Sequence, residues 1–535
     1  MKKLYASITV LLILILVCTA CVTPIKYTQT WTPAPPPDDA KWSVRTDYSG
    51  LTPHSPFSSL YSRLGSGPLT ELVPSDSYGL LLPYASAAVT EGGYLQKSSF
   101  GLVTTDGVIV TDLIYSSISR AYAGNWYNRT LLPSYMLSVD LPEKEPGWYP
   151  ERRYAACALD GSWATSFVYR DIKYTEDLML LVRDYDDYDV DVYDYDGKFI
   201  YNMKSLNFST KLNSDNWSGD VVYSASEGYS RALLRDRTVA FIELATGELI
   251  YTDYVEASGF NEGLAAVKVG YGYGSGQLWG FIDSNFKLVI PPKYTEPPVF
   301  IDGHAVTMTP DGSYHIIDKR GNTLLTLSDA IISQDYGGTG FIIYDYEWNI
   351  KGLYPLDLST FFPSEKPGMR GYIQSIGDGW YSFQVDGAYD TYLFSAEEEY
   401  FFPGVTNIGS VTGGYVVFHA YDGNMSRMGV STLDGRAVVP PEEDMTIFAV
   451  ESESGEVFFV VSTSGYFAYD FASKYRPSAY KILATDGKVM LSGSGQISYD
   501  ETMGLYSVLA EDSFTYLDAN FNVIVRIPMM SYTLD

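Results

Sequence analysis

Asp-Gly pairs recur along this chain, each between two short runs of apolar residues. Glycine adopts the positive φ angles that a tight β-turn requires and that most side chains resist. The pairs are Asp106-Gly107, Asp160-Gly161, Asp196-Gly197, Asp434-Gly435 and Asp486-Gly487. Weaker copies of the same pattern are Thr246-Gly247, Asn285-Phe286, Arg320-Gly321 and Asn520-Phe521. Beyond residue 20 no long stretch has a 3.6-residue apolar period, so these turns predict an all-β body.

The segments around these turns repeat one another. One unit begins at Phe260-Asn-Glu-Gly and contains Leu278-Trp-Gly-Phe-Ile-Asp283. The next begins at Phe300-Ile-Asp-Gly and contains Ser313-Tyr-His-Ile-Ile-Asp318. The first unit is five residues longer, which matches an insertion in the glycine-rich loop Tyr271–Gly276. Spacings of this size indicate repeated supersecondary units, none of which can bury its apolar face alone.

The central hairpin also recurs without the rest of the unit. Phe100-Gly leads to Tyr115, and Tyr154-Ala leads to Tyr169, in both cases 15 residues later. A glycine after the aromatic residue, as at Gly101 and Gly280, lets a neighbouring strand approach closely. We expect Trp279 and Gly280 to stabilise the scaffold by packing.

These residues resemble the WG-repeat proteins. Leu278-Trp-Gly-Phe-Ile-Asp283 and Pro291-Pro292-Lys-Tyr294 follow the family pattern, and residues 251–326 hold the best repeats. The resemblance implies short antiparallel strands in serial array and, often, an exported bacterial protein. It implies no reaction, because the landmark Trp and Gly of the family are packing residues.

The best unit contains four strand-like segments, around Tyr251–Val255, Leu264–Val269, Leu278–Asp283 and Lys287–Ile290. Four short strands suit one blade of a β-propeller. The turns mark about ten units, more than the usual four to eight blades. We therefore predict repeat-built, antiparallel four-stranded units in a β-propeller, with an open β-solenoid or two smaller propellers as the alternatives.

The first 20 residues are typical of a bacterial lipoprotein signal peptide. Lys2 and Lys3 are followed by the apolar stretch Leu4–Val17, by two small residues and by Cys21. Such a stretch suits secretion better than a stable membrane span. Cys21 is therefore predicted to carry lipid and to anchor the chain on the extracytoplasmic face of the cell membrane. The alternatives are an uncleaved membrane helix and a soluble protein cleaved after Ala20.

Residues 21–45 are rich in proline and form the predicted tether, and residues 46–535 form the predicted repeat domain. Proline fixes φ and removes amide donors, so such a run stays extended. The formal net charge is −29, from 65 acidic and 36 basic residues. This charge repels nucleic acid phosphates, so we expect no nucleic acid partner. Cys157, flanked by alanines, is expected to be a buried strand residue.

The densest carboxylate cluster is Asp184–Gly197. Its alternating acids Asp189, Asp191, Asp194 and Asp196 make a weak calcium candidate, since oxygen ligands at alternate positions can surround Ca²⁺. Val192 stands where the calcium-loop pattern requires another acid. We favour two hairpins with turns at Asp186-Asp187 and Asp196-Gly197, and we expect no metal and no cofactor.

Function is open at this point. We expect a non-catalytic surface module that binds protein or glycan through loops on one face, with Tyr271 and Tyr273 as the candidate binding loop. Tyrosine supplies the amphipathic contact surface that binding loops use. The alternatives are a glycan-active enzyme and a structural or assembly role in the cell envelope. Residue spacing nominates no catalytic pair.

Overall fold

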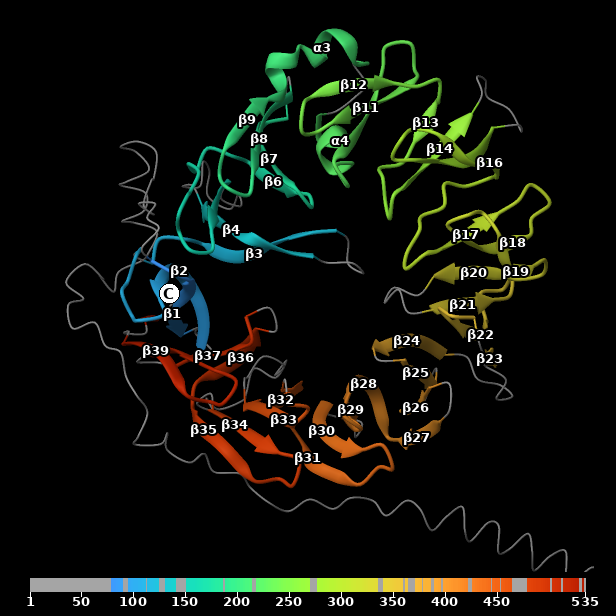
Figure 1. Cartoon of the computed structure of the whole chain (residues 1–535). Helices are drawn as coiled ribbons and strands as arrows, with labels where there is room; N and C mark the ends of the chain where they lie inside the picture. Colours follow the sequence, from blue (N-terminus) through green and yellow to red (C-terminus); the bar gives the residue numbers. More distant parts are fainter. Residues whose placement is uncertain are drawn as a thin grey trace, which may run out of the picture.

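The strands of this computed structural model form eleven sheets, antiparallel except for one parallel strand pair, arranged as blades around a ring (Figure 1). The structure describes residues 78–533 except for 90–94, 112, 125–129, 141–150, 186–187, 214–217, 270–276, 335–339, 359–360, 364–370, 378, 386–388, 396–397, 422–425, 444, 453, 464–478, 501–502, 511–512 and 529–531. Within these residues seven sheets have four strands and four have three. The fold is a β-propeller, as predicted, with more blades than the usual four to eight.

The blades are numbered here in chain order. Blade 1 holds β1 (Leu81–Val89), β2 (Leu95–Thr104) and the C-terminal β40 (Tyr532–Thr533). Blade 2 holds β3 (Ser117–Ala123), β4 (Thr130–Asp140) and β5 (Arg152–Ala158). Blade 3 holds β6 (Asp171–Tyr174), β7 (Leu178–Asp184), β8 (Asp189–Asp194) and β9 (Phe199–Asn202). Three short helices follow: η2 (Met203–Leu206), α3 (Phe208–Lys211) and α4 (Ser218–Tyr223).

The middle blades contain the best repeats. Blade 4 holds β10 (Tyr229–Leu233), β11 (Val239–Glu243) and β12 (Glu248–Tyr251). Blade 5 holds β13 (Glu256–Ala257), β14 (Leu264–Val269), β15 (Leu278–Asp283) and β16 (Leu288–Tyr294). Blade 6 holds β17 (His304–Met308), β18 (Tyr314–Asp318) and β19 (Thr323–Leu327). Blade 7 holds β20 (Ile331–Gln334), β21 (Gly340–Tyr344), β22 (Ile350–Pro355) and β23 (Phe362–Pro363).

The last four blades each have four strands. Blade 8 holds β24 (Gly371–Gly377), β25 (Trp380–Val385), β26 (Asp390–Phe394) and β27 (Glu399–Pro403). Blade 9 holds β28 (Val405–Thr412), β29 (Tyr415–Tyr421), β30 (Ser426–Thr432) and β31 (Ala437–Glu443). Blade 10 holds β32 (Met445–Glu451), β33 (Val457–Thr463), β34 (Ala479–Ala484) and β35 (Val489–Ser494). Blade 11 holds β36 (Gln496–Asp500), β37 (Leu505–Leu509), β38 (Ser513–Leu517) and β39 (Val523–Pro528).

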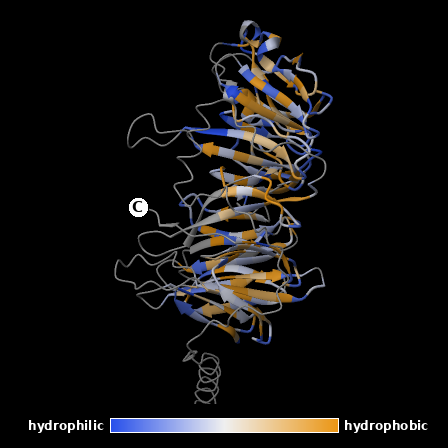
Figure 2. Ribbon diagram, turned by 90° about the vertical axis from the view of Figure 1, so that its left-hand side faces the viewer, coloured by the Kyte–Doolittle hydropathy of each residue, from blue (hydrophilic) through white to orange (hydrophobic). Residues whose placement is uncertain are grey.

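The middle strands of the blades are buried on both faces. β7 and β14 each contain runs of four or more buried residues, whereas the outer strands β16 and β19 are largely exposed. A strand packed between two blades cannot alternate apolar with polar residues, because both of its faces meet another sheet. Figure 2 shows the ring edge-on, with apolar segments on strands of successive blades. This packing explains why the sequence contains short continuous apolar runs.

The first and last blades close the ring. β40 pairs in parallel with β1, where Ala88 is opposite Tyr532. The Tyr516 hydroxyl of β38 donates a hydrogen bond to the Pro83 carbonyl of β1. Leu82 of β1 packs with Phe514 of β38 in one apolar core. Closure therefore rests on both side-chain packing and strand pairing, and it rules out the open solenoid.

Positive φ angles occur at each of the nine turns that the sequence predicts from Asp-Gly and its weaker copies. They occur at Gly107, Gly161, Gly197, Gly247, Phe286, Gly321, Gly435, Gly487 and Phe521. The residue before each of these has a negative φ, so the loops are not the two-residue turns that Asp-Gly usually signals. An aspartate three positions before the residue with positive φ organises several of them. Asp283, for example, accepts from the backbone N–H groups of Asn285 and Lys287 at 3.0 and 2.9 Å.

The aromatic pairs of the sequence repeat face each other across strands. Phe100 pairs with Tyr115 and Tyr154 with Tyr169 in antiparallel bridges. Trp279 pairs in the same way with Tyr294 in blade 5. Trp279 is only 6% exposed. A Cβ on Gly280 would lie 2.4 Å from the Ile290 carbonyl oxygen, so this close strand approach requires glycine.

Candidate functional site

Four hairpin turns from successive blades form a row at one end of the strands. We call the segments Thr175–Leu178, Ser226–Tyr229, Asn261–Leu264 and Ile301–His304 the turn row. In the last three, φ is positive at both central residues: Glu227-Gly228, Glu262-Gly263 and Asp302-Gly303. These are the two-residue turns with primed geometry, and backbone bridges close each one.

Carboxylates link each turn of the row to the next. Glu176 accepts from the Glu227 N–H at 2.9 Å, and Glu227 accepts from the Gly263 N–H at 2.8 Å. Glu262 accepts from the Gly303 N–H at 2.8 Å and also pairs with Lys319 Nζ at 3.1 Å. The same interaction therefore joins blades 3, 4, 5 and 6 in sequence. Hydrogen bonds from backbone N–H to an ionised carboxylate are among the stronger ones in proteins.

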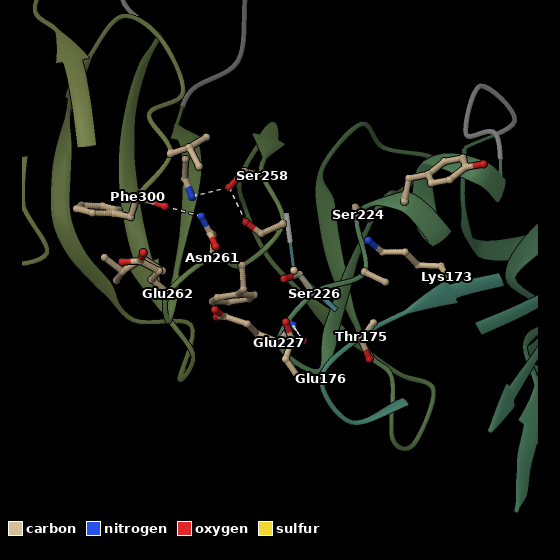
Figure 3. A pocket seen from close by; sticks show the side chains of 18 of the residues that line it. Lys173, Thr175, Glu176, Ser224, Ser226, Glu227, Ser258, Asn261, Glu262 and Phe300 are labelled. Carbon is tan, nitrogen blue, oxygen red and sulfur yellow. Dashed lines mark hydrogen bonds between the residues drawn. The ribbon is translucent and has the colours of Figure 1, made fainter. Parts of the chain in front are cut away.

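A pocket of about 400 Å³ lies along the turn row (Figure 3). Its lining comes from blades 3, 4, 5 and 6 and from the ends of β3 and β4, at Gly124 and Thr130. Phe260, Phe281 and Phe300 supply apolar surface. The volume falls in the range of small-molecule sites, which combine apolar walls with a few placed polar groups.

Most polar side chains of the pocket already have partners. Thr175 bonds to the backbone of Leu178, and Ser258 accepts from the Ala266 N–H. Asn261 donates to the Phe300 carbonyl. These groups shape the turns and leave less capacity for a ligand.

Lys173 differs from these groups. Within the described residues its ammonium makes no hydrogen bond or ion pair. Burial lowers the pKa of Lys173, and the negative charges of Glu176 and Asp171 oppose that shift. Asp171 accepts hydrogen bonds from the hydroxyls of Tyr185 and Tyr223, each at 2.7 Å. The pocket thus presents one unengaged cationic group beside carboxylates that are engaged elsewhere.

Asp189, Asp191 and Asp194 lie in β8 and Asp196 lies in the turn that follows, in line with the favoured interpretation, whose other turn at Asp186-Asp187 lies outside the described residues. β7, β8 and β9 pair in antiparallel order. Asp191 is buried, pairs with Arg183 at 2.7 Å and accepts from Tyr169. Asp194 accepts from the N–H groups of Asp196 and Lys198, and Asp189 accepts from Asn202. In the part of the chain that the structure describes, no three His, Cys, Asp or Glu side chains gather as a metal site.

Several predicted residues lie outside the described ones. Cys21 and the candidate binding loop with Tyr271 and Tyr273 are among them. Cys157 is described: it is fully buried in β5, and burial raises the pKa of its thiol to about 12. A thiol with such a pKa is a packing residue at neutral pH. Among the described residues no helix combines the length and the apolar character needed to cross a bilayer.

Sequence reasoning missed the turn row and its pocket. A signal was present, because an acidic residue precedes glycine at Glu227, Glu262 and Asp302, at the same place in three units. What the sequence does not show is that each carboxylate reaches the following turn. That contact depends on how neighbouring blades are placed.

Comparison with known protein families supports the repeat. Residues 245–273 and 279–307 match the family model described as WG containing repeat. Each matched segment spans strands of two neighbouring blades: β12 to β14 in the first segment and β15 to β17 in the second. The match supports the resemblance found in the sequence, in the stretch with the best repeats. No curated protein sequence matches the chain.

Solved structures with similar arrangements share little sequence with it. A eukaryotic initiation factor is 10% identical, with a TM-score of 0.36 over 77% of this chain and 96% of that one. BamB from Moraxella catarrhalis is 10% identical, with a TM-score of 0.20 over 66% of this chain and 94% of that one. The Cps50 (Swd1) beta-propeller domain of Myceliophteria thermophila is 11% identical, with a TM-score of 0.20 over 49% and 92%. The assignment of the fold rests on the sheets and their closure.

Proposed function

We propose that this chain is a non-catalytic β-propeller scaffold that binds a protein or glycan ligand at the turn-row pocket. The observation that carries the proposal is a pocket of about 400 Å³ lined by the turn row of blades 3 to 6 and by the ends of β3 and β4 in blade 2. Its turns are fixed to one another by the glutamate contacts, so its shape is set before a ligand arrives. A preformed site loses little conformational entropy on binding.

The chemistry of the carboxylates favours binding over a reaction. Glu176, Glu227 and Glu262 each accept a backbone N–H of the next blade. A general acid or base must instead be free to exchange a proton with a substrate. Their role is to hold the turns in place.

The proposal includes export and a lipid anchor. Cys21, after the signal-like residues 1–20, would carry the lipid, and residues 21–45 would hold the propeller away from the membrane. Mass spectrometry of the mature N-terminus tests this part. Release of a Cys21→Ala variant from membranes is the expected result, and a mature chain that retains Met1 contradicts the anchor.

Glycan and peptide arrays test the binding function with the full chain in detergent. Ser226→Trp places a bulky ring in the pocket, and Ser454→Trp, on an exposed turn before β33, is the matched control. We expect Ser226→Trp to lose the signal that the wild type and the control share. The proposal fails if the wild type gives no signal, or if Ser226→Trp binds as well as the control.

A further inference from the structure

Lys173 is the group of the pocket that neither the fold nor the proposed binding role accounts for. It belongs to β6, and Figure 3 shows its side chain extending toward the segment Ser224–Glu227. Three lysines of the middle blades form ion pairs: Lys268 with Glu256, Lys319 with Glu262 and Lys351 with Asp345. Lys173 makes no such pair within the described residues.

The acids nearest to Lys173 have other partners. Asp171 accepts the two phenol hydroxyls described above, and it also accepts the Ile172 N–H at 2.8 Å. Glu176 holds the Glu227 N–H. Both charges act on Lys173 from a distance and partly offset the effect of burial on its pKa. The lysine thus lies in a pocket, half-buried, with its nitrogen available.

An amine in this situation has a distinct reactivity. Only the neutral amine is nucleophilic, and a lysine whose pKa falls on burial is neutral in a larger fraction of molecules. Protein lysines that react with carbonyl compounds are activated by this kind of desolvation.

We propose that Lys173 captures the carbonyl group of a small polyhydroxylated ligand, such as the open-chain form of a reducing sugar, as an imine. The Nζ lone pair attacks the carbonyl carbon, and the C=O electron pair moves to oxygen, which takes up a proton. The nitrogen loses a proton to give a carbinolamine. The hydroxyl, once protonated, then leaves as water, and C=N forms. The balance is amine plus carbonyl gives imine plus water, without an oxidant or reductant.

The surroundings suit each partner of this step. The protonated imine keeps the positive charge of the ammonium, which Asp171 and Glu176 already favour. Ser226 lines the same pocket, where its hydroxyl could bond to a hydroxyl group of the ligand. The inference rests on the proposed function, because it uses the same pocket, and it specifies the ligand class.

Reductive trapping tests it. The full chain is incubated with glyceraldehyde and cyanoborohydride, which reduces the imine to a stable amine, and the labelled lysines are mapped by mass spectrometry. Because burial lowers the pKa of Lys173, a larger fraction of this lysine is the neutral, reactive amine. We therefore expect Lys173 to be labelled faster than Lys268, Lys319 and Lys351. Labelling of Lys173 at or below their rates overturns the inference.

Two variants separate this inference from its alternatives. Glu176→Gln removes a charge that raises the pKa of Lys173, so labelling of Lys173 should become faster, whereas a general-base role of Glu176 would make it slower. Slower labelling in a variant that still folds contradicts the mechanism. Lys173→Arg keeps the positive charge but cannot form the imine. If wild-type chain binds an array sugar without any adduct on Lys173, this inference fails while the binding function stands.

Discussion

Trp279 shows at the scale of one residue why the repeat has a landmark aromatic. The indole is buried in the core of blade 5, beside Phe281 and Tyr294, and Lys268 Nζ lies 5.5 Å from the ring centre. Blades 1 and 2 have Phe100 and Tyr154 at the corresponding place. Packing explains why the position holds Trp, Phe or Tyr in different blades, whereas binding of a ligand would require the same functional group in each.

Trp279→Ala should therefore destabilise the protein by about 3–5 kcal/mol, as large-to-small changes in cores do. Trp348→Ala is the control, because that indole is 67% exposed. Its substitution should change the free energy of unfolding by no more than about 0.5 kcal/mol. Denaturant melts of the two variants measure the difference. If Trp279→Ala lost as little stability as the control, the aromatic position of the repeat would not be a packing position.

Buried tyrosines give the molecule a predictable response to alkali. Burial raises the pKa of Tyr294 and of Tyr480 to about 12. The unfolded chain releases these protons near pH ~10, while the folded chain keeps them. Stability is therefore complete below pH ~10 and falls as the pH rises from there toward 12. Urea midpoints at pH 8, 9 and 11 should decline mainly across the last step, and a midpoint that rises between pH 9 and 11 would contradict the assignment.

At the scale of elements, the glutamate contacts hold successive blades in register. Glu227 of one turn accepts the Gly263 N–H of the next at 2.8 Å. Because the contact is solvent-exposed, its contribution to the free energy of unfolding lies near the lower end of the range for hydrogen bonds to charged groups. Glu227→Ala should cost about 1 kcal/mol, and Glu227→Gln, which keeps an acceptor oxygen, should cost less.

Amide hydrogen exchange at Gly263 is the direct measurement for this pair of variants. Exchange should be faster in Glu227→Ala than in Glu227→Gln, and Gly303, which is held by Glu262, should be unaffected in both. Equal protection of Gly263 in both variants would show that the carboxylate does not hold the turn.

The strands and the outer turns could be predicted from the sequence because their causes are local. Phe286 and Phe521 adopt positive φ at the places that the Asp-Gly pattern assigns to them. The spacing from Phe100 to Tyr115 reflects one hairpin, so it too is visible in the sequence. The turn row was not predicted, because Glu176 and Glu227 are 51 residues apart and meet only when two blades pack.

The role of the many tyrosines becomes visible only at the scale of the whole molecule, because they join neighbouring blades. The Tyr135 hydroxyl of blade 2 donates to the Leu81 carbonyl of blade 1 at 2.8 Å, and Tyr201 of blade 3 donates to Leu244 beside β11 at 3.0 Å. Each ring fills apolar space between blades while its hydroxyl satisfies a carbonyl of the neighbour. Sequence composition reveals the abundance of tyrosine, but not that it joins blades.

Ring closure determines how much the junction between the first and last blades contributes to the stability of the protein. In an open array a terminal blade has one neighbour, so a residue on its free face is exposed and tolerates substitution. Leu82 of blade 1 is instead fully buried against Phe514 and Val525 of blade 11. The junction should therefore behave like any junction inside the ring.

Leu82→Ala should cost about 2–5 kcal/mol, the range for leucine in a packed core. Leu180→Ala, in the core that joins blades 3 and 4, is the matched control with the same burial. A chain ending at Pro528 lacks β40 but keeps the apolar junction, so it should lose much less than Leu82→Ala does. Denaturant melts rank the three proteins. If Leu82→Ala unfolds like the wild type while Leu180→Ala is destabilised, the ring is open in solution, because only an open ring leaves Leu82 without its partners from blade 11.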